Sequence, residues 1–207
     1  EDLTTLDTFT IDDSDTEEID DALSLTVENG DTTIGIHIAD AGHYAPPHSL
    51  LDKSALARGT TIYLPSGRYP MLPHAIGSDK ASLVAGSERP ALSFFVRVTE
   101  SGELAPVRIT RSIVNVKKRM SYEDADKTVC ENVSSPYGAL LAKLSTLAER
   151  RKTKRVEQGA VIIDSDEVKV KVSRGVISVI PLTSPSRSRA MVSECMIMAN
   201  EAAARYL

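Results

Sequence analysis

Apolar positions in the first part of the chain alternate or run together in a way that predicts β-strands. Phe9 and Ile11 mark one strand, residues 22–27 a second, and residues 32–39, rich in β-branched side chains, a third. Residues 28–31 read Glu-Asn-Gly-Asp, which is a hairpin turn signal. The pattern therefore predicts a β-meander, with an acidic loop between its first two strands.

Helical spacing of apolar residues recurs in three later segments. The leucines and alanine between Leu50 and Leu56 predict a helix over residues 48–57. A stripe of leucines predicts a longer helix over residues 136–155, and a third helix is predicted over residues 189–207.

Further strand patterns separate these helices. Strands are predicted at residues 91–98 and 107–116, and a hairpin at residues 161–172 and 175–180. The prolines and the glycine within and beside residues 63–72 predict an irregular loop. Strands followed by mixed elements, without regular βαβ alternation, predict an α+β fold with a mixed, mainly antiparallel sheet core and packed helices.

Length and composition add few constraints. A chain of 207 residues suits one hydrophobic core, so a single domain over residues 1–207 is expected. Because the chain begins at Glu1 instead of Met, we expect it to be a fragment or a processed product. No apolar run is long enough for a membrane span, and no secretory signal pattern is present at the N-terminus. Cys130 and Cys195 lie far apart without zinc-site spacing, which fits a reduced, cytoplasmic location.

The charge distribution is more informative than the net charge. A formal net charge of −5 argues against a protein that simply coats nucleic acid, which would be basic. It is compatible with an enzyme that binds a polyanion through metal ions. Seven acids crowd into ten positions, at Asp12, Asp13, Asp15, Glu17, Glu18, Asp20 and Asp21.

This acidic cluster has three possible interpretations. A charge run is usually a solvated loop, but Ile19 lies inside the cluster, and its burial would fix the neighbouring carboxylates. A calcium EF-hand loop is excluded, because counting from Asp13 puts Glu18 where glycine is needed and Ser24 where glutamate is needed. The third interpretation is a site for hard cations such as Mg²⁺, which prefer oxygen ligands and promote phosphodiester hydrolysis.

Several segments closely resemble the catalytic domain of the ribonuclease II and R family, the RNB domain. They are TIDDSDTEEIDDALSL, IGIHIADAGHYAPPHSLLDKSALARGTTIYLPSGRYPMLP, RMSY, the Gly159–Ala160 pair and ECMIMAN. The order and spacing of these segments are similar to the family's, and together they cover nearly the whole chain. The chain is therefore identified as the N-terminal part of an RNB-like domain, with the fold that this family implies.

The resemblance implies a set of acidic site residues. Asp12, Asp20 and Asp21 match three of the family's four catalytic and metal-binding positions, and Glu18 matches the fourth, where the family usually has aspartate. Asp20 is expected to be the most rate-critical of them, and Asp12 and Asp21 direct metal ligands. The implied cofactor is Mg²⁺, for which Mn²⁺ is expected to substitute.

The resemblance also implies RNA contacts. Tyr63 matches the family's tyrosine that stacks on the 3′-terminal base, and Ile163 falls where a second aromatic is usual. Near the last helix, Ser193 and Glu194 stand where the family has two acids, the first of them near the ribose. Glu194 is kept as a candidate RNA contact.

The implied activity is processive 3′→5′ hydrolysis of single-stranded RNA to nucleoside 5′-monophosphates. Two alternatives stay open: a catalytically weak RNB-like protein that binds RNA or regulates, and a phosphodiesterase that acts on DNA. The family's arginine-rich block has no counterpart here, and its role is not transferred to Arg187 or Arg189. The family's flanking RNA-binding domains are expected to lie outside this chain, and a monomer is expected.

Two residue types receive structural interpretations. His37 lies within a predicted strand and near His43 and Asp40, yet without metal-site spacing, so a structural histidine is predicted. Neither cysteine has a base at a suggestive spacing, and Cys195 is expected to be packed inside the fold.

Overall fold

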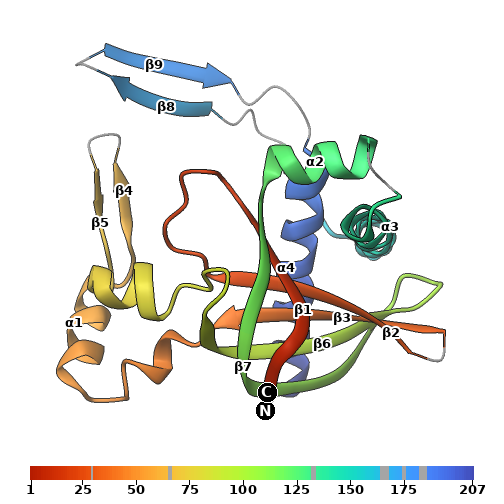
Figure 1. Ribbon diagram of the computed structural model, residues 1–207, viewed down its shortest axis with the longest axis horizontal. Coiled ribbons are helices and arrows are strands. Elements are labelled where there is room, and N and C mark those ends of the chain that lie inside the picture. Colours follow the sequence, from red (N-terminus) through yellow and green to blue (C-terminus); the bar gives the residue numbers. More distant parts are fainter. Residues whose placement is uncertain (29, 65–66, 132–133, 164–167, 174–175, 182–185) are drawn as a thin grey trace.

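A closed β-barrel forms the centre of the computed structural model, which describes the chain except residues 29, 65–66, 132–133, 164–167, 174–175 and 182–185 (Figure 1). The barrel strands are β1 (Asp2–Asp12), β2 (Asp21–Glu28), β3 (Asp31–Ala39), β6 (Glu88–Val98) and β7 (Leu104–Ser121), in that order around the barrel. Neighbours pair antiparallel except β1 and β7, which pair in parallel and close the barrel. The predicted α+β fold with a mixed, mainly antiparallel sheet is confirmed.

The two long helices pack onto this barrel. Helix α3 (Pro136–Glu157) begins at Ser135, whose side chain accepts a hydrogen bond from the Gly138 amide at 3.0 Å. Helix α4 (Arg187–Tyr206) begins two residues earlier than predicted, because Ser186 caps it in the same way. The shared core joins both helices to the strands through Phe9, Ile11, Leu23, Ile34, Ile36, Leu141, Leu144, Met191 and Met198.

Helix α2 (Tyr122–Glu131) was not predicted. It follows β7 directly and has only two buried apolar residues, Ala125 and Val129, one turn apart. A single pair at helical spacing is too weak a pattern to identify a helix from sequence, and contacts with the rest of the core supply the missing stability.

The peripheral elements differ most from expectation. Helix α1 (Leu50–Arg58) is present, but only part of the predicted apolar stripe is covered: Ala55 is buried, whereas Leu50 and Leu56 are 87% and 77% exposed. The predicted irregular loop instead contains a small hairpin of β4 (Ile62–Leu64) and β5 (Gly67–Tyr69). Pro70 and Pro73 fall outside both three-residue strands, so they remove no ladder hydrogen bond there.

The remaining short elements complete the path of the chain. A 3₁₀ turn, η1 (Ala41–His43), follows β3, and a π-helical turn, η2 (Ala75–Lys80), precedes β6. The later predicted hairpin is present as β8 (Val168–Ser173) and β9 (Val176–Pro181). Residues 161–163 of its predicted first strand are not in a strand, and residues 164–167 lie outside the described residues. None of the helices in the described ranges is both long and apolar enough to span a membrane.

The structural interpretations of His37 and Cys195 are confirmed. Both are fully buried. The His37 ring lies between two serines, with Nε2 3.0 Å from Ser24 Oγ and Nδ1 2.7 Å from Ser93 Oγ. Burial lowers the pKa of His37 to about 4, so the ring is neutral at physiological pH.

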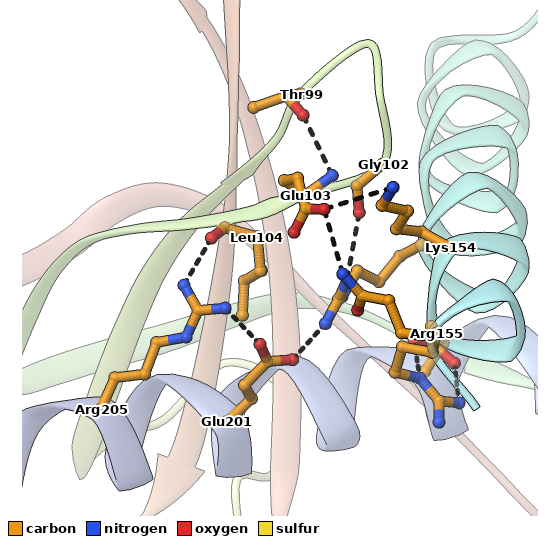
Figure 2. Close-up of polar contacts among 11 residues, drawn as sticks. Thr99, Gly102, Glu103, Leu104, Lys154, Arg155, Glu201 and Arg205 are labelled. Atoms are coloured by element: carbon orange, nitrogen blue, oxygen red, sulfur yellow. Dashed lines mark hydrogen bonds and ion pairs between the residues drawn. The ribbon is translucent and has the colours of Figure 1, made fainter. Parts of the chain in front are cut away.

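A network of ion pairs attaches α3 and α4 to the turn between β6 and β7 (Figure 2). Arg151 is almost fully buried, donates to the Gly102 carbonyl at 3.2 Å and pairs with Glu201. Glu201 also pairs with Arg205, which donates to the Leu104 carbonyl at 2.8 Å. Glu201 therefore balances the buried charge of Arg151.

Replacing Glu201 with alanine tests this role. Glu201→Ala leaves the Arg151 guanidinium buried without its carboxylate, so the free energy of unfolding is expected to fall by about 2–3 kcal/mol. Urea unfolding measures the loss. Asp31→Ala removes the partner of Arg97 in a much more exposed pair and is the matched control, with an expected change below about 1 kcal/mol. Equal losses in the two variants would contradict the assigned role.

Candidate functional site

Three of the predicted acidic residues lie at one end of the barrel, where β1 finishes and β2 starts. Asp12 is the last residue of β1, Asp21 is the first of β2, and Asp20 directly precedes it. The backbone on both sides is fixed: Asp12 is in register with Ser121 of β7, and the Asp20 carbonyl accepts from the Ala39 amide at 2.8 Å. Regular strand pairing thus positions these carboxylates.

The connection between the two strands is anchored by Ile19. Its side chain is 1% exposed, its amide donates to Ser82 Oγ at 3.0 Å, and its carbonyl accepts from the Leu83 amide at 2.9 Å. The prediction that Ile19 is buried is confirmed. Its burial fixes Asp20 and Asp21 in a segment that charge repulsion alone would push into solvent.

The carboxylates influence one another electrostatically. Burial raises the pKa of Asp12 to about 6, where Arg119 opposes the rise and Asp20 adds to it. Burial also raises the pKa of Asp21 to about 7, with further contributions from the charges of Asp12 and Asp20. Burial of its carboxyl group also raises the pKa of Asp20, because neighbouring protein atoms displace water there. Part of the Asp20 residue remains exposed.

The chemistry of these residues fits a hard divalent cation. Asp12 Oδ2 is buried and has no hydrogen-bond partner among the described residues. Within the same residues, no three or more Asp, Glu, His or Cys side chains are already arranged as a metal site. Carboxylates repel one another and converge on a point only when positive charge or protons screen them. Asp12, Asp20 and Asp21 supply the oxygen donors that Mg²⁺ prefers and are its candidate ligands.

Glu18, the fourth predicted ligand, is held by a different set of contacts. Its Oε1 accepts from Ser78 Oγ at 3.3 Å and lies 3.6 Å from Arg68 Nη1. Its Oε2 accepts from the Tyr63 hydroxyl at 3.5 Å. Glu18 thus connects the acidic loop to the β4–β5 hairpin and to η2, and its role as a metal ligand stays a prediction.

A cleft of about 530 Å³ opens between the acidic loop and this hairpin. Tyr63 is 68% exposed beside it, so its ring face is available to a flat ligand. The residues that line the cleft are Asp13, Asp15, Thr16, Glu17, Glu18, Tyr63, Leu64, Gly67 and Arg68.

Two arginines fix the other side of the acidic loop. Arg119 of β7 donates to the Thr16 carbonyl at 2.7 Å. Arg189 of α4 pairs with Asp13 and lies with its guanidinium carbon 4.0 Å from the centre of the Tyr122 ring. From the sequence, neither Arg119 nor Arg189 was expected to fix this loop. No local pattern could identify the contacts of Arg119 with Thr16 and of Arg189 with Asp13, because each of these two joins residues more than one hundred positions apart.

The remaining predicted RNA contacts lie elsewhere. Glu194 is 3% exposed, and both of its carboxylate oxygens are bound by Arg155, at 2.8 and 2.7 Å. It lines a separate hollow of about 190 Å³ beside α3 and α4. Ile163 is 87% exposed and follows the end of α3. The structure brings Tyr63 and Glu18 together, but it does not place Glu194 in the same cleft.

Comparison with known proteins agrees with this geometry. Residues 1–207 match the family described as the RNB domain. The chain belongs to the RNB domain family. Ribonuclease R of Chlamydia pneumoniae is 34% identical over 209 residues, which cover 100% of this chain and 31% of that protein. The RNB domain described here thus spans about a third of the length of that relative.

Solved structures confirm the fold of this RNB domain. RNase R of Mycoplasma genitalium, in complex with ribose-methylated single-stranded RNA, matches with a TM-score of 0.87 at 23% identity. The match covers 97% of this chain and 32% of that one. Yeast Ssd1, described as a pseudonuclease, matches with a TM-score of 0.72 at 19% identity, over 94% of this chain and 24% of its own. The same fold is therefore found in a ribonuclease and in a pseudonuclease.

The raised pKa values predict an unusual dependence of stability on pH. The pKa values of Asp12 and Asp21 in the folded protein lie above the value of about 3.9 for an unfolded aspartate. Between about pH 4 and pH 7 the folded state therefore binds more protons, and these two residues make the free energy of unfolding fall as pH rises. Asp21→Asn removes part of this effect and is expected to stabilise the protein by about 1–2 kcal/mol near pH 8.

Urea unfolding in EDTA at several pH values measures the free energy of unfolding of Asp21→Asn and of the wild type. The stability gained by the variant relative to the wild type is expected to grow from about pH 4 to about pH 7. Asp31→Asn, at the exposed first residue of β3, serves as the control and should leave the pH dependence unchanged. A difference that is constant across this range would show that Asp21 has an ordinary pKa.

Proposed function

We propose that this RNB domain forms the catalytic centre of a 3′→5′ exoribonuclease, which hydrolyses single-stranded RNA processively with Mg²⁺ and releases nucleoside 5′-monophosphates. The observation that carries the proposal is the group of aspartates with raised pKa values at one end of the barrel, including a buried carboxylate oxygen without a partner. The family match over residues 1–207 and the single-stranded RNA bound to Mycoplasma genitalium RNase R support the choice of substrate.

Each aspartate has a proposed role in the reaction. Asp12 and Asp21 would hold the cation through their oxygens, and Mn²⁺ is expected to be accepted by the same donors. When bound, Mg²⁺ supplies Lewis-acid stabilisation of negative charge on the phosphate. Asp20, which keeps an exposed surface, would orient the attacking water and take its proton. The water oxygen bonds to phosphorus as the bond to the 3′ oxygen of the preceding nucleotide breaks.

The cleft provides a place for the terminal nucleotide. The exposed Tyr63 ring would stack on the 3′-terminal base, which holds any base without reading sequence. We keep Ile163 as a second, aliphatic contact because its side chain is exposed. Glu194 is the least supported RNA contact, because Arg155 already binds both of its oxygens.

The role of Asp20 can be tested in the intact protein that carries this domain. Asp20→Asn keeps the size of the side chain but removes the proton acceptor, so turnover is expected to fall about 1,000-fold or more. RNA affinity is expected to stay within about 3-fold, because base stacking is unchanged. Degradation rate and RNA affinity are measured on the same preparation. Asp124→Asn, at an exposed position in α2, is the control. Near-normal degradation by Asp20→Asn would remove Asp20 from the mechanism.

The second candidate is a catalytically weak RNB-like protein that binds RNA or regulates. Three features favour it: the contact of Glu18 with Arg68, the aliphatic Ile163, and Ser193 in place of an acid. Yeast Ssd1, which has this fold, is described as a pseudonuclease.

One assay separates these functions. End-labelled single-stranded RNA is incubated with the intact protein in Mg²⁺ or in EDTA, beside a DNA strand of the same sequence. The proposed exonuclease releases 5′-monophosphates from the RNA 3′ end only with Mg²⁺. Binding without shortening would establish the second candidate, and shortening of the DNA strand would establish a DNA-directed phosphodiesterase.

A further inference from the structure

Glu18 is enclosed by residues from two separate elements. Its side chain is 13% exposed, and Arg68, which lies beside it, is 24% exposed. Ser78 of η2 donates to Oε1, and Tyr63 of β4 donates to Oε2. Both carboxylate oxygens therefore have protein partners, in contrast to Asp12, whose Oδ2 has none among the described residues.

The β4–β5 hairpin presents Tyr63 and Arg68 together. These residues are directly opposite each other in the antiparallel register, so their side chains leave the same face of the hairpin. Arg68 Nη2 also donates to Ser78 Oγ at 3.0 Å and pairs with Glu17. Arg68, Ser78 and Glu18 thus form a connected group that ends at the Tyr63 hydroxyl.

The chain also leaves space for the Glu18 carboxylate. A Cβ atom at Gly77 would lie 3.2 Å from Glu18 Oε1, closer than ordinary van der Waals contact. Glycine at this position lets η2 approach the carboxylate, and Ser78, the next residue, then reaches it. The longer side chain of glutamate, compared with the aspartate that the family resemblance leads one to expect, spans this distance.

We propose that Glu18 is a positioning residue for the base-stacking tyrosine: its carboxylate joins Arg68 and Ser78 to the Tyr63 hydroxyl and holds the ring beside the cleft, instead of binding the metal ion directly. The inference rests on the proposed function, because it assigns Tyr63 to the 3′-terminal base. Glu18 and Tyr63 both line the cleft, whereas Asp12, Asp20 and Asp21 are not among its described lining residues. The Arg68 guanidinium beside Glu18 also repels a second cation.

The tether acts by reducing the freedom of the ring before RNA binds. An exposed tyrosine must lose side-chain freedom when it stacks on a base, which weakens binding. When Glu18 holds the Tyr63 hydroxyl, the tyrosine side chain has less conformational freedom to lose on stacking. Removal of Glu18 should therefore weaken RNA binding and raise KM, while kcat and the requirement for metal stay nearly constant.

A double-mutant cycle tests the coupling without catalysis. Glu18→Ala removes the carboxylate, Tyr63→Phe removes only the hydroxyl, and the double variant removes both. Affinity for a short single-stranded RNA is measured in EDTA, on the intact protein. Each single variant is expected to weaken RNA binding about 3–10-fold. The double variant is expected to bind RNA no more weakly than the single variant with the larger loss. Full multiplication of the two losses would overturn the proposal.

Metal titration and a conservative variant separate positioning from ligation. The Mg²⁺ concentration for half-maximal degradation is expected to stay within about 2-fold in Glu18→Ala and to rise about 10-fold or more in Asp12→Asn. Glu18→Gln retains an oxygen that accepts from Tyr63 and should recover most of the RNA affinity in EDTA. An increased metal requirement in both Glu18 variants, with unchanged affinity in EDTA, would identify Glu18 as a ligand. If the wild-type protein degrades no RNA, the proposed function fails, while the binding cycle still decides the role of Glu18.

Discussion

The repulsion among Asp12, Asp20 and Asp21 is the constraint on which the rest of this structure depends. Three carboxylates with raised pKa values are held at one end of a barrel, where burial removes the water that would otherwise screen them. Such an arrangement is unfavourable by itself and persists only because the surrounding fold determines it. The buried Ile19 anchors the chain before Asp20, and the parallel pairing of β1 with β7 fixes Asp12. The stability of the barrel therefore keeps carboxylates that repel one another in place.

Sequence patterns predicted the elements better than their assembly. Alternating or continuous apolar positions identified the barrel strands, and the leucine stripe identified α3, because each of these patterns lies within one strand or a few helical turns. The closure of the barrel was not predictable in this way. It depends on the pairing of β1 with β7, for example Asp12 with Ser121, and no local pattern encodes a contact across that separation. The β4–β5 hairpin was missed because its strands are only three residues long and are flanked by prolines.

In the candidate site, too, the acidic cluster could be predicted from local sequence, whereas the contacts of its side chains with distant residues could not. The acidic cluster was evident from composition, and the family resemblance assigned Asp12, Asp20, Asp21 and Glu18 to one group. The structure describes two environments within that group. Asp12 retains a buried oxygen without a partner among the described residues, while Glu18 contacts Arg68, from the far strand of a hairpin. Proximity in sequence could not separate these environments, because the partners of Glu18 lie 45 to 60 positions away.

Three arginines near the acidic loop are already bound by groups of the protein. Arg119 is bound to the backbone of the loop, Arg189 to Asp13, and Arg68 to Glu17 and Glu18. These guanidinium groups stabilise the loop, and each has a protein partner that a phosphate would have to displace. A chain with a formal net charge of −5 and an acidic cleft repels an RNA backbone at long range. If the proposed function holds, attraction of RNA to this site would come from a bound cation and from stacking on Tyr63. Under that proposal the position of the tyrosine ring would matter as much as the position of the aspartates, because each would support an attraction that the net charge of this chain opposes.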